Sequence, residues 1–270
     1  MTREEKLQLI LQKNAYNVDD LVSIVELLRL PGGCPWDAEQ THDSIISSLI
    51  EECYECIDAI RERDWTHLRE ELGDVLLQVV FHARIEQEND VFGMAEVSND
   101  ICAKLIHRHP HVFGTVEVEN SAEVLKNWEA IKGEEKQRVT VTDKLRAIPP
   151  MYPALMRAQK VGKKAACFDF ANADEVYKKL DEEIAEVKAA AASGDQAAVE
   201  EELGDLLLTV TSLARKLGVK SEEALFHATN KFIDRFEKVE NAVMEAGKDM
   251  ETLTMAELDE IWDGIKHRHD

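Results

Sequence analysis

The sequence contains one segment written twice: "REELGDVLLQV" at residues 69–79 and "EEELGDLLLTV" at residues 200–210. The offset between the copies is 131 residues, and between residues 64 and 77 eight of the fourteen residues are identical to their partners. Identity at a fixed offset indicates an internal duplication. The chain of 270 residues is therefore predicted to fold as two related domains of ordinary size.

The apolar pattern predicts an all-α fold. Glycine and proline gather at residues 31–35, 110–114 and 149–153, and the text between them has almost no period-2 pattern. Apolar residues instead recur at three and four positions: Leu21, Ile24, Val25 and Leu28; Leu72, Leu76, Val79 and Val80; Leu203, Leu206, Leu207 and Val210. We expect two tandem helical bundles, 1–135 and 151–270, joined by a linker at 136–150.

Each copy of the repeat reads as a helical hairpin. In the first copy we predict one helix from about Thr41 to Arg63, with Asp64 as the N-cap of the next helix. Asp195, which follows a Ser-Gly pair, is the matching N-cap in the second copy. In "WDAEQT", Asp37 is a further candidate N-cap.

The charge of the chain excludes some classes of partner. With 54 acidic against 32 basic residues, the formal charge is −22, which repels the phosphates of nucleic acid and an anionic membrane face. No apolar run approaches the roughly 20 residues that a membrane helix needs. Long nucleic acid and membranes are therefore not expected as partners, whereas a small anion remains possible if a cation bridges it to carboxylates.

The five cysteines predict a reduced, cytoplasmic protein, because their number is odd and the first residues lack an apolar signal-peptide core. Cys53 and Cys56 form a Cys-x-x-Cys pair that fits redox work or half of a zinc site. The pair lies in a helical pattern without a second cysteine pair, which favours two small packing residues.

Carboxylates in the repeat have a spacing that places them together. Glu52 and Glu55 are at i and i+3, so they share one helix face. The same spacing occurs in the second helix of the first hairpin and in both helices of the second hairpin: Glu71 with Asp74, Glu183 with Glu186, and Glu202 with Asp205. If the helices of a hairpin pack antiparallel, each hairpin brings four carboxylates together.

Four carboxylates so close repel one another unless protons or cations compensate, and ligands that are all oxygen favour Mg²⁺, with Mn²⁺ as a substitute. Gly73 and Gly204 lie in these helices at a cost near 1 kcal/mol, which the close approach of a helix or a ligand would explain. Two other interpretations stay open. The acids could be solvated helix faces, or they could form a di-iron centre, although a ferritin-like centre requires Glu-x-x-His on two of its helices and the pairs here end in Glu or Asp.

Basic residues gather in the second copy. Lys231 and Arg235 share a helix face, and so do Trp262 and Lys266, while Lys179 lies on the acidic face of its own helix. Each alone is commonly a solvated lysine or a core tryptophan, but beside a metal site they suggest a bound polyanion with an aromatic group next to a base. The first copy has Lys104 and Arg108 at the same spacing, but Ser48 stands where the second copy has Lys179.

The sequence resembles the tandem form of the MazG family of nucleoside triphosphate pyrophosphohydrolases. The motifs are "GGCPWDAEQTHDSI", the repeated Glu-Leu-Gly-Asp, "HRHPHVFG", "IPPMYPALMRAQKVGKKAA" and "NKFIDRF". The resemblance implies a homodimeric, Mg²⁺-dependent enzyme that hydrolyses NTPs and dNTPs to the monophosphate and pyrophosphate. It implies catalytic metal ligands and, in a second set, contacts to triphosphate and base: Glu183, Glu186, Glu202 and Asp205; Lys179, Lys231, Arg235, Trp262 and Lys266. The equivalent metal ligands of the first copy are Glu52, Glu55, Glu71 and Asp74.

The expected mechanism is attack of a metal-activated water on the α-phosphorus, with Glu182 or Glu183 as the proton acceptor. Two rival functions remain open at this point. One is a related all-α hydrolase of narrow specificity, such as a dUTP or phosphoribosyl-ATP hydrolase. The other is a helical interaction module whose acidic faces bind proteins.

Overall fold

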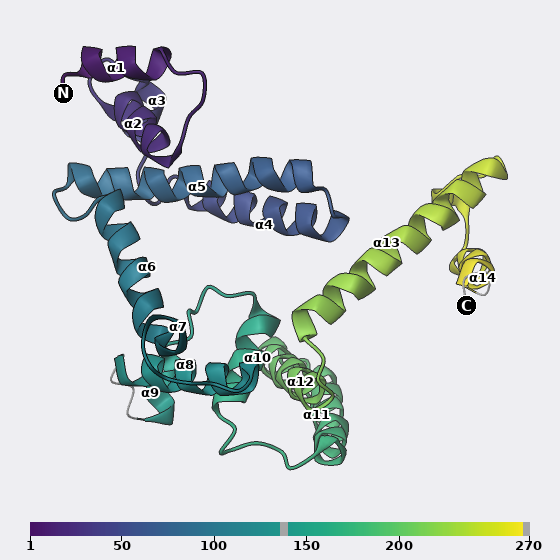
Figure 1. Cartoon of the computed structure of the whole chain (residues 1–270). Coiled ribbons are helices and arrows are strands. Elements are labelled where there is room, and N and C mark those ends of the chain that lie inside the picture. The colour runs from purple at the N-terminus through teal and green to yellow at the C-terminus, as the bar shows by residue number, and fades with distance from the viewer. Residues whose placement is uncertain (136–139, 267–270) are drawn as a thin grey trace. The chain divides into compact units, whose positions relative to one another are not determined.

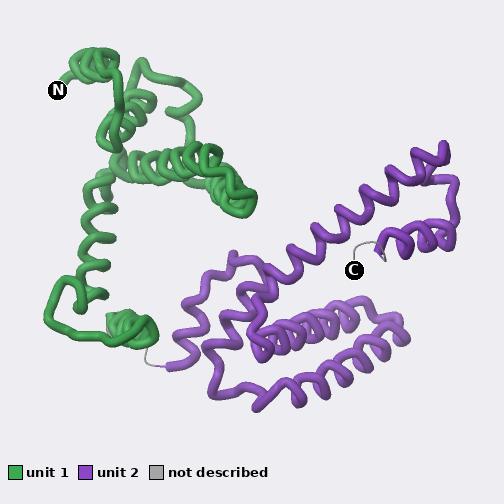
Figure 2. The backbone as a smooth tube through the Cα atoms, turned by 45° about the vertical axis from the view of Figure 1, so that its right-hand side comes forward, with its two compact units in different colours: residues 1–135 green, residues 136–270 purple. Residues whose placement is uncertain are grey.

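The computed structural model describes residues 1–135 and 140–266, and within them every regular element is a helix (Figure 1). The prediction of an all-α fold is confirmed. The chain divides into two compact units, Met1–Glu135 and Lys136–Asp270 (Figure 2). Each unit contains one copy of the repeat.

The first unit is organised around a helical hairpin. Its helices are α1 (Arg3–Leu11), α2 (Val18–Arg29), α3 (Pro35–Glu39), α4 (Ile46–Glu62), α5 (Trp65–Glu88), α6 (Met94–Arg108), α7 (Pro110–Phe113) and α8 (Ser121–Glu135). Helices α4 and α5 pack along each other, α2 packs on α5, and α8 packs on α6. The buried core lies where α2 and the second half of α5 meet: Val25, Ile45, Val80, Phe81 and Ile85.

The second unit repeats this hairpin. Its helices are α9 (Val141–Arg146), α10 (Ala154–Lys164), α11 (Ala173–Ser193), α12 (Gln196–Lys216), α13 (Ser221–Glu245), the 3₁₀ turn η1 (Met250–Thr252) and α14 (Met255–Lys266). Helices α11 and α12 form the hairpin, α10 packs on α12 and α13, and α14 packs on α13.

Residues 140–150, part of the segment expected to be a linker, contain a short helix. Residues 136–139 lie outside the described residues, and the rest of the segment contains α9 and the buried side chain of Ile148. Helix α9 packs on α10. The described part of this segment therefore belongs to the second unit.

Both hairpins turn in the same way. Arg63 after α4 and Gly194 after α11 have φ values of 60° and 75°, the left-handed conformation that ends many helices. Asp64 and Asp195 then cap α5 and α12, because each carboxylate accepts hydrogen bonds from the N–H groups two and three residues on, at 3.0–3.4 Å. Both predicted N-caps are confirmed.

Two helix starts differ from the sequence-based prediction. The helix predicted from Thr41 begins only at Ile46, because the Thr41 N–H donates to Ser44 Oγ (2.9 Å) and this local bond competes with a helical turn. Asp37 is not an N-cap. Cys34 occupies that position, and Asp37 lies within the short helix α3.

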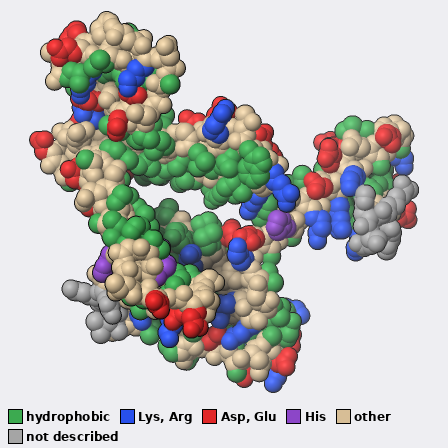
Figure 3. Space-filling view, in the orientation of Figure 1, with side chains coloured by type: hydrophobic (Ala, Val, Ile, Leu, Met, Phe, Trp, Pro, Cys, Tyr) green, Lys and Arg blue, Asp and Glu red, His purple; other side chains and the backbone are tan. Residues whose placement is uncertain are grey.

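Many apolar side chains of the repeat are exposed. Leu72 and Leu207 are each 55% exposed and Leu203 is 43% exposed, although the apolar stripe predicted them on a packed face. Hydrophobic side chains gather over the α4–α5 hairpin (Figure 3). Exposed apolar areas of this kind mark surfaces that bind another protein or a ligand. In the described part of the chain, no helix is both long and apolar enough to cross a bilayer.

Candidate metal and substrate site

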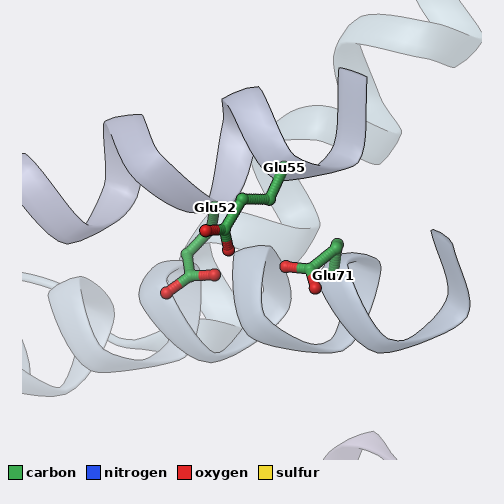
Figure 4. A group of neighbouring side chains, drawn as sticks. All are labelled: Glu52, Glu55 and Glu71. Atoms are coloured by element: carbon green, nitrogen blue, oxygen red, sulfur yellow. The ribbon is translucent and has the colours of Figure 1, made fainter. Parts of the chain in front are cut away.

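The hairpin of the first unit brings three glutamates together. Glu52 and Glu55 project from α4 toward α5, where Glu71 lies (Figure 4). One carboxylate oxygen from each lies within 4.8 Å of the other two. Glu71 is 6% exposed, so at least one of these charges is held away from bulk water.

The hairpin of the second unit makes the same group from Glu183 and Glu186 of α11 and Glu202 of α12, again with one oxygen of each within 4.8 Å of the others. Glu183 is 3% exposed, and its Oε2 is buried without a hydrogen-bond partner. A buried carboxylate oxygen without a donor is costly unless a cation approaches it.

The fourth acid of each predicted set lies outside these groups. Asp74 is half-buried and Asp205 is exposed, and neither joins the three glutamates within 4.8 Å. Their charges still act on the site, because Asp74 raises the pKa of Glu52 and Asp205 raises the pKa of Glu202. The structure therefore brings together three of the four predicted ligands in each copy.

Burial and mutual repulsion disfavour the charged state of these groups. Desolvation is the largest cause that raises the pKa of Glu52, Glu71 and Glu202, and neighbouring carboxylates add to it. Glu55 acts in this way on Glu71, and Glu186 acts on Glu202. A site of this electrostatic kind binds a divalent cation favourably, since the cation removes the repulsion.

A lysine distinguishes the second copy from the first. Lys179 Nζ lies 2.7 Å from a carboxylate oxygen of Glu182, 2.9 Å from Glu183 and 3.9 Å from Glu186. The hydrogen bonds to Glu182 and then to Glu183 hold the pKa of Lys179 well above its usual range. The lysine stays charged beside the acidic group, where it suits an anionic ligand of the metal.

The first copy has a histidine contact that the sequence reasoning missed. His67 Nε2 lies 2.9 Å from Glu71 Oε1. The spacing of these two residues is i and i+4 on α5, so the helical pattern alone could have shown the pair. The matching position in the second copy is Ala198. The two sites therefore differ on both helices.

The glycines of the repeat face open space. A Cβ atom added at Gly73 or Gly204 would meet no described atom within 4 Å. The sequence had suggested the approach of a neighbouring helix or of a ligand, and no helix among the described residues makes that approach. Space beside the carboxylates is what a ligand or a second chain would need.

Apart from Lys179 on α11, the predicted phosphate and base contacts lie on α13 and α14. The ring of Trp262 on α14 lies 5.3 Å from the ring of Phe232 on α13. Phe232 stands between Lys231 and Arg235 in the sequence, so α13 and α14 hold the tryptophan near the segment that carries the two cations. Lys266 ends α14. In residues 140–266, no described hydrogen bond or ion pair joins Lys231 or Arg235 to the three glutamates. Within one unit, Lys179 is therefore the predicted cation that contacts the acids, while Lys231 and Arg235 lie on another helix pair.

Two duplicated all-α hairpins, each with three carboxylates gathered from facing helices, form an arrangement that suits a divalent cation. The family model of the MazG nucleotide pyrophosphohydrolase domain matches residues 40–113 and 172–240, once in each unit. The chain belongs to this family, and the resemblance predicted from the motifs is confirmed.

Some similar proteins match over nearly the whole chain, and others over about half of it. The chain is 44% identical over 250 residues to the nucleoside triphosphate pyrophosphohydrolase/pyrophosphatase MazG of Thermotoga maritima, which is 92% of this chain and 95% of that protein. It is 45% identical over 262 residues to the nucleoside triphosphate pyrophosphohydrolase of Escherichia coli K12, 93% and 97% of the two chains. A nucleoside triphosphate pyrophosphohydrolase of Mycobacterium tuberculosis is 42% identical over 148 residues, 54% of this chain and 44% of that protein.

Proposed function

We propose that the protein is a Mg²⁺-dependent pyrophosphohydrolase that converts a broad range of NTPs and dNTPs to monophosphates and pyrophosphate in the cytoplasm. The observation that carries this proposal is the group of Glu183, Glu186 and Glu202 beside Lys179. Carboxylates without a neighbouring cation would suit a metal ion but would give no contact to a phosphate chain. Acids with a permanently charged lysine suit a metal that bears a phosphate chain.

The residues fit a hard divalent cation. All ligands are carboxylate oxygens, and the unpartnered Oε2 of Glu183 gives the cation a buried charge to bind. Glu183, Glu186 and Glu202 would hold Mg²⁺ or Mn²⁺, and Asp205, which lies just outside the group, would complete the set when a ligand draws it in. The ion would supply an activated water and neutralise charge on the α-phosphate.

Different side chains bind different parts of the substrate in this proposal. Lys179 is placed to bind oxygens of the phosphate chain next to the metal. Lys231 and Arg235 bind the distal phosphates, and Trp262 with Lys266 contacts the base. The proton acceptor for the water is Glu182 or Glu183. Both are paired with Lys179, but Glu182 is exposed whereas Glu183 is buried.

We propose that the active form is a homodimer. The exposed leucines Leu203 and Leu207 lie on α12 close to the carboxylates, and an apolar surface beside an acidic site suits a second copy of this chain. A second copy would also supply α13 and α14 to the glutamates that they do not reach within one unit. Light scattering should give about twice the mass of 30.6 kDa of one chain. A monomeric mass in a fully active sample would contradict the dimer.

We expect Mg²⁺ to stabilise the folded protein in the absence of any nucleotide. A ligand that binds only the native state at 100 times its dissociation constant adds about 2.7 kcal/mol to the free energy of unfolding. Thermal melting with MgCl₂ and with EDTA measures this, and KCl of equal ionic strength is the control. An unchanged midpoint would favour a protein-binding module without a metal, the alternative that the acidic faces suggest.

The same samples test the reaction. Release of pyrophosphate is measured with each of the common NTPs and dNTPs, with and without Mg²⁺. A broad response supports the proposal. Activity confined to dUTP, or to phosphoribosyl-ATP added as a further substrate, would replace it with a narrow hydrolase. We place the main activity in the second unit, because the first copy has Ser48 in place of Lys179.

A further inference from the structure

The end of the first unit holds an aromatic ring with two cations close to it. The guanidinium carbon of Arg108, at the end of α6, lies 5.4 Å from the ring centroid of Trp128 on α8. The Nζ atom of Lys132, one turn further along α8, lies 4.5 Å from the same centroid. Arg108 is 7% exposed. Burial of a charged group on this scale needs a partner of opposite charge.

That partner is Glu135. The Nε of Arg108 donates to both of its carboxylate oxygens, at 3.1 and 3.3 Å, and the terminal NH₂ group of Arg108 donates to Oε2 as well. His107 Nε2 lies 3.7 Å from Oε1. The hydrogen bonds from Arg108, followed by the charges of Arg108, His107 and Lys104, hold the pKa of Glu135 below its ordinary value. One carboxylate thus faces several cationic groups.

The same residue types occur in the second unit at the same spacing. Helix α8 contains "WEAIK" at residues 128–132, and α14 contains "WDGIK" at residues 262–266. The helices that pack against them, α6 and α13, carry Lys104 with Arg108 and Lys231 with Arg235. In the second unit these are the groups proposed to bind the triphosphate and the base.

The carboxylate is the difference between the copies. Glu135 stands three residues after the lysine of its motif, and the corresponding residue of the second copy is His269, which lies outside the described residues. A carboxylate and a phosphate make the same paired hydrogen bonds with a guanidinium group. Glu135 therefore occupies the position on Arg108 that a phosphate would take.

We propose that Arg108, Trp128 and Lys132 form a second nucleotide-binding site, in the first unit, and that Glu135 closes it as an internal counter-ion. The inference rests on the proposed function for the kind of ligand. The base stacks on Trp128 and a phosphate replaces Glu135 on Arg108. A triphosphate carries more charge than one carboxylate, so it competes for the cations when its concentration is high.

The test is the number of nucleotides bound per full-length chain. The probe is the α,β-methylene analogue of ATP, whose carbon bridge replaces the bond to be cleaved, and equilibrium dialysis gives the bound amount at saturation. We expect Glu135→Gln to bind about one analogue more per chain than the parent protein at the same free concentration. Glu129→Gln, which removes an exposed carboxylate from the same helix, is the matched control and should bind as the parent does.

The added site must depend on the named residues. Trp128→Ala or Arg108→Ala in the Glu135→Gln protein should remove the extra analogue. No gain in a folded Glu135→Gln protein, or a gain that survives both substitutions, overturns the proposal. Should that protein fail to fold by circular dichroism, Glu135→Ala repeats the measurement under the same criteria.

This result is independent of the proposed function. Failure of the proposed function appears as a parent protein that binds no analogue and releases no pyrophosphate. Failure of the inference appears as equal binding by the parent and Glu135→Gln, or as a gain that survives both further substitutions, whatever the parent binds.

Discussion

Replacement of Glu202 by glutamine is expected to lower the rate of pyrophosphate release by more than about 100-fold, because loss of an outer-shell partner alone costs 10- to 100-fold and Glu202 is proposed as a direct ligand. Glu202 is the one member of the group that α12 contributes, so its removal opens the side of the site opposite α11. The measurement is initial rate against Mg²⁺ concentration, with helix content followed by circular dichroism.

The same substitution is expected to stabilise the metal-free protein at neutral pH. Burial and the charge of Glu186 raise the pKa of Glu202 in the folded state, so the ionised group opposes folding above that pKa. Below the pKa that Glu202 has in the unfolded chain, the group is protonated in both the folded and the unfolded state. The difference in stability between parent and variant should vanish in that range. In EDTA, the melting midpoint of Glu202→Gln should therefore exceed that of the parent at pH 7 and equal it in acid.

Glu71→Gln is the matched control in the first unit. It occupies the same position of the repeat and removes the same chemical group. We expect it to raise metal-free stability in the same way and to leave most of the pyrophosphate release intact. Full activity of Glu202→Gln, or equal loss of activity in both variants, would contradict the placement of catalysis in the second unit.

Substitution of Lys231 and Arg235 by alanine together is expected to lower kcat/KM for a triphosphate by about 100-fold, since each charge-assisted hydrogen bond contributes about 1.5 kcal/mol or more. Neither residue has a described ion pair with the glutamates of its own unit, so the substitutions leave that acidic group intact. A lower kcat/KM therefore reports weaker substrate binding. If the two cations bind the distal phosphates before and during reaction, KM rises and kcat falls less.

The control for this pair is Lys220→Ala. Lys220 precedes α13, and its Nζ lies 2.7 Å from Glu223, so the substitution removes a lysine charge near the same helix. Its kcat/KM should match the parent value. Pyrophosphate release that is insensitive to loss of both Lys231 and Arg235 would refute their role as phosphate contacts, whether or not the protein is a dimer.

Features of the site that depend on residues close in sequence could be predicted. The pairing of Glu52 with Glu55 and of Glu183 with Glu186 followed from i and i+3 spacing, because the helical period alone sets which side chains share a face. The caps Asp64 and Asp195 were equally local, since each acts on the next two or three N–H groups.

The sequence predicted that both acids of the second helix would join each pair, and the structure brings in only one. Glu71 and Glu202 lie in the acidic groups, whereas Asp74 and Asp205, one turn further on, lie outside them. This difference depends on how far one helix slides along the other. The left-handed turn at Arg63 or Gly194 sets that register, and no spacing within a single helix contains it.

Contacts between distant residues were decided by the tertiary structure alone. Arg108 and Glu135 are 27 positions apart, and their pairing depends on how α8 packs on α6. The duplication, the all-α fold and the carboxylate pairs were determined by the sequence, because they follow from a repeat and a helical period. Which carboxylates meet, and which cation is already neutralised, depends on helix packing, where the free energy comes from surfaces that the chain brings together only on folding.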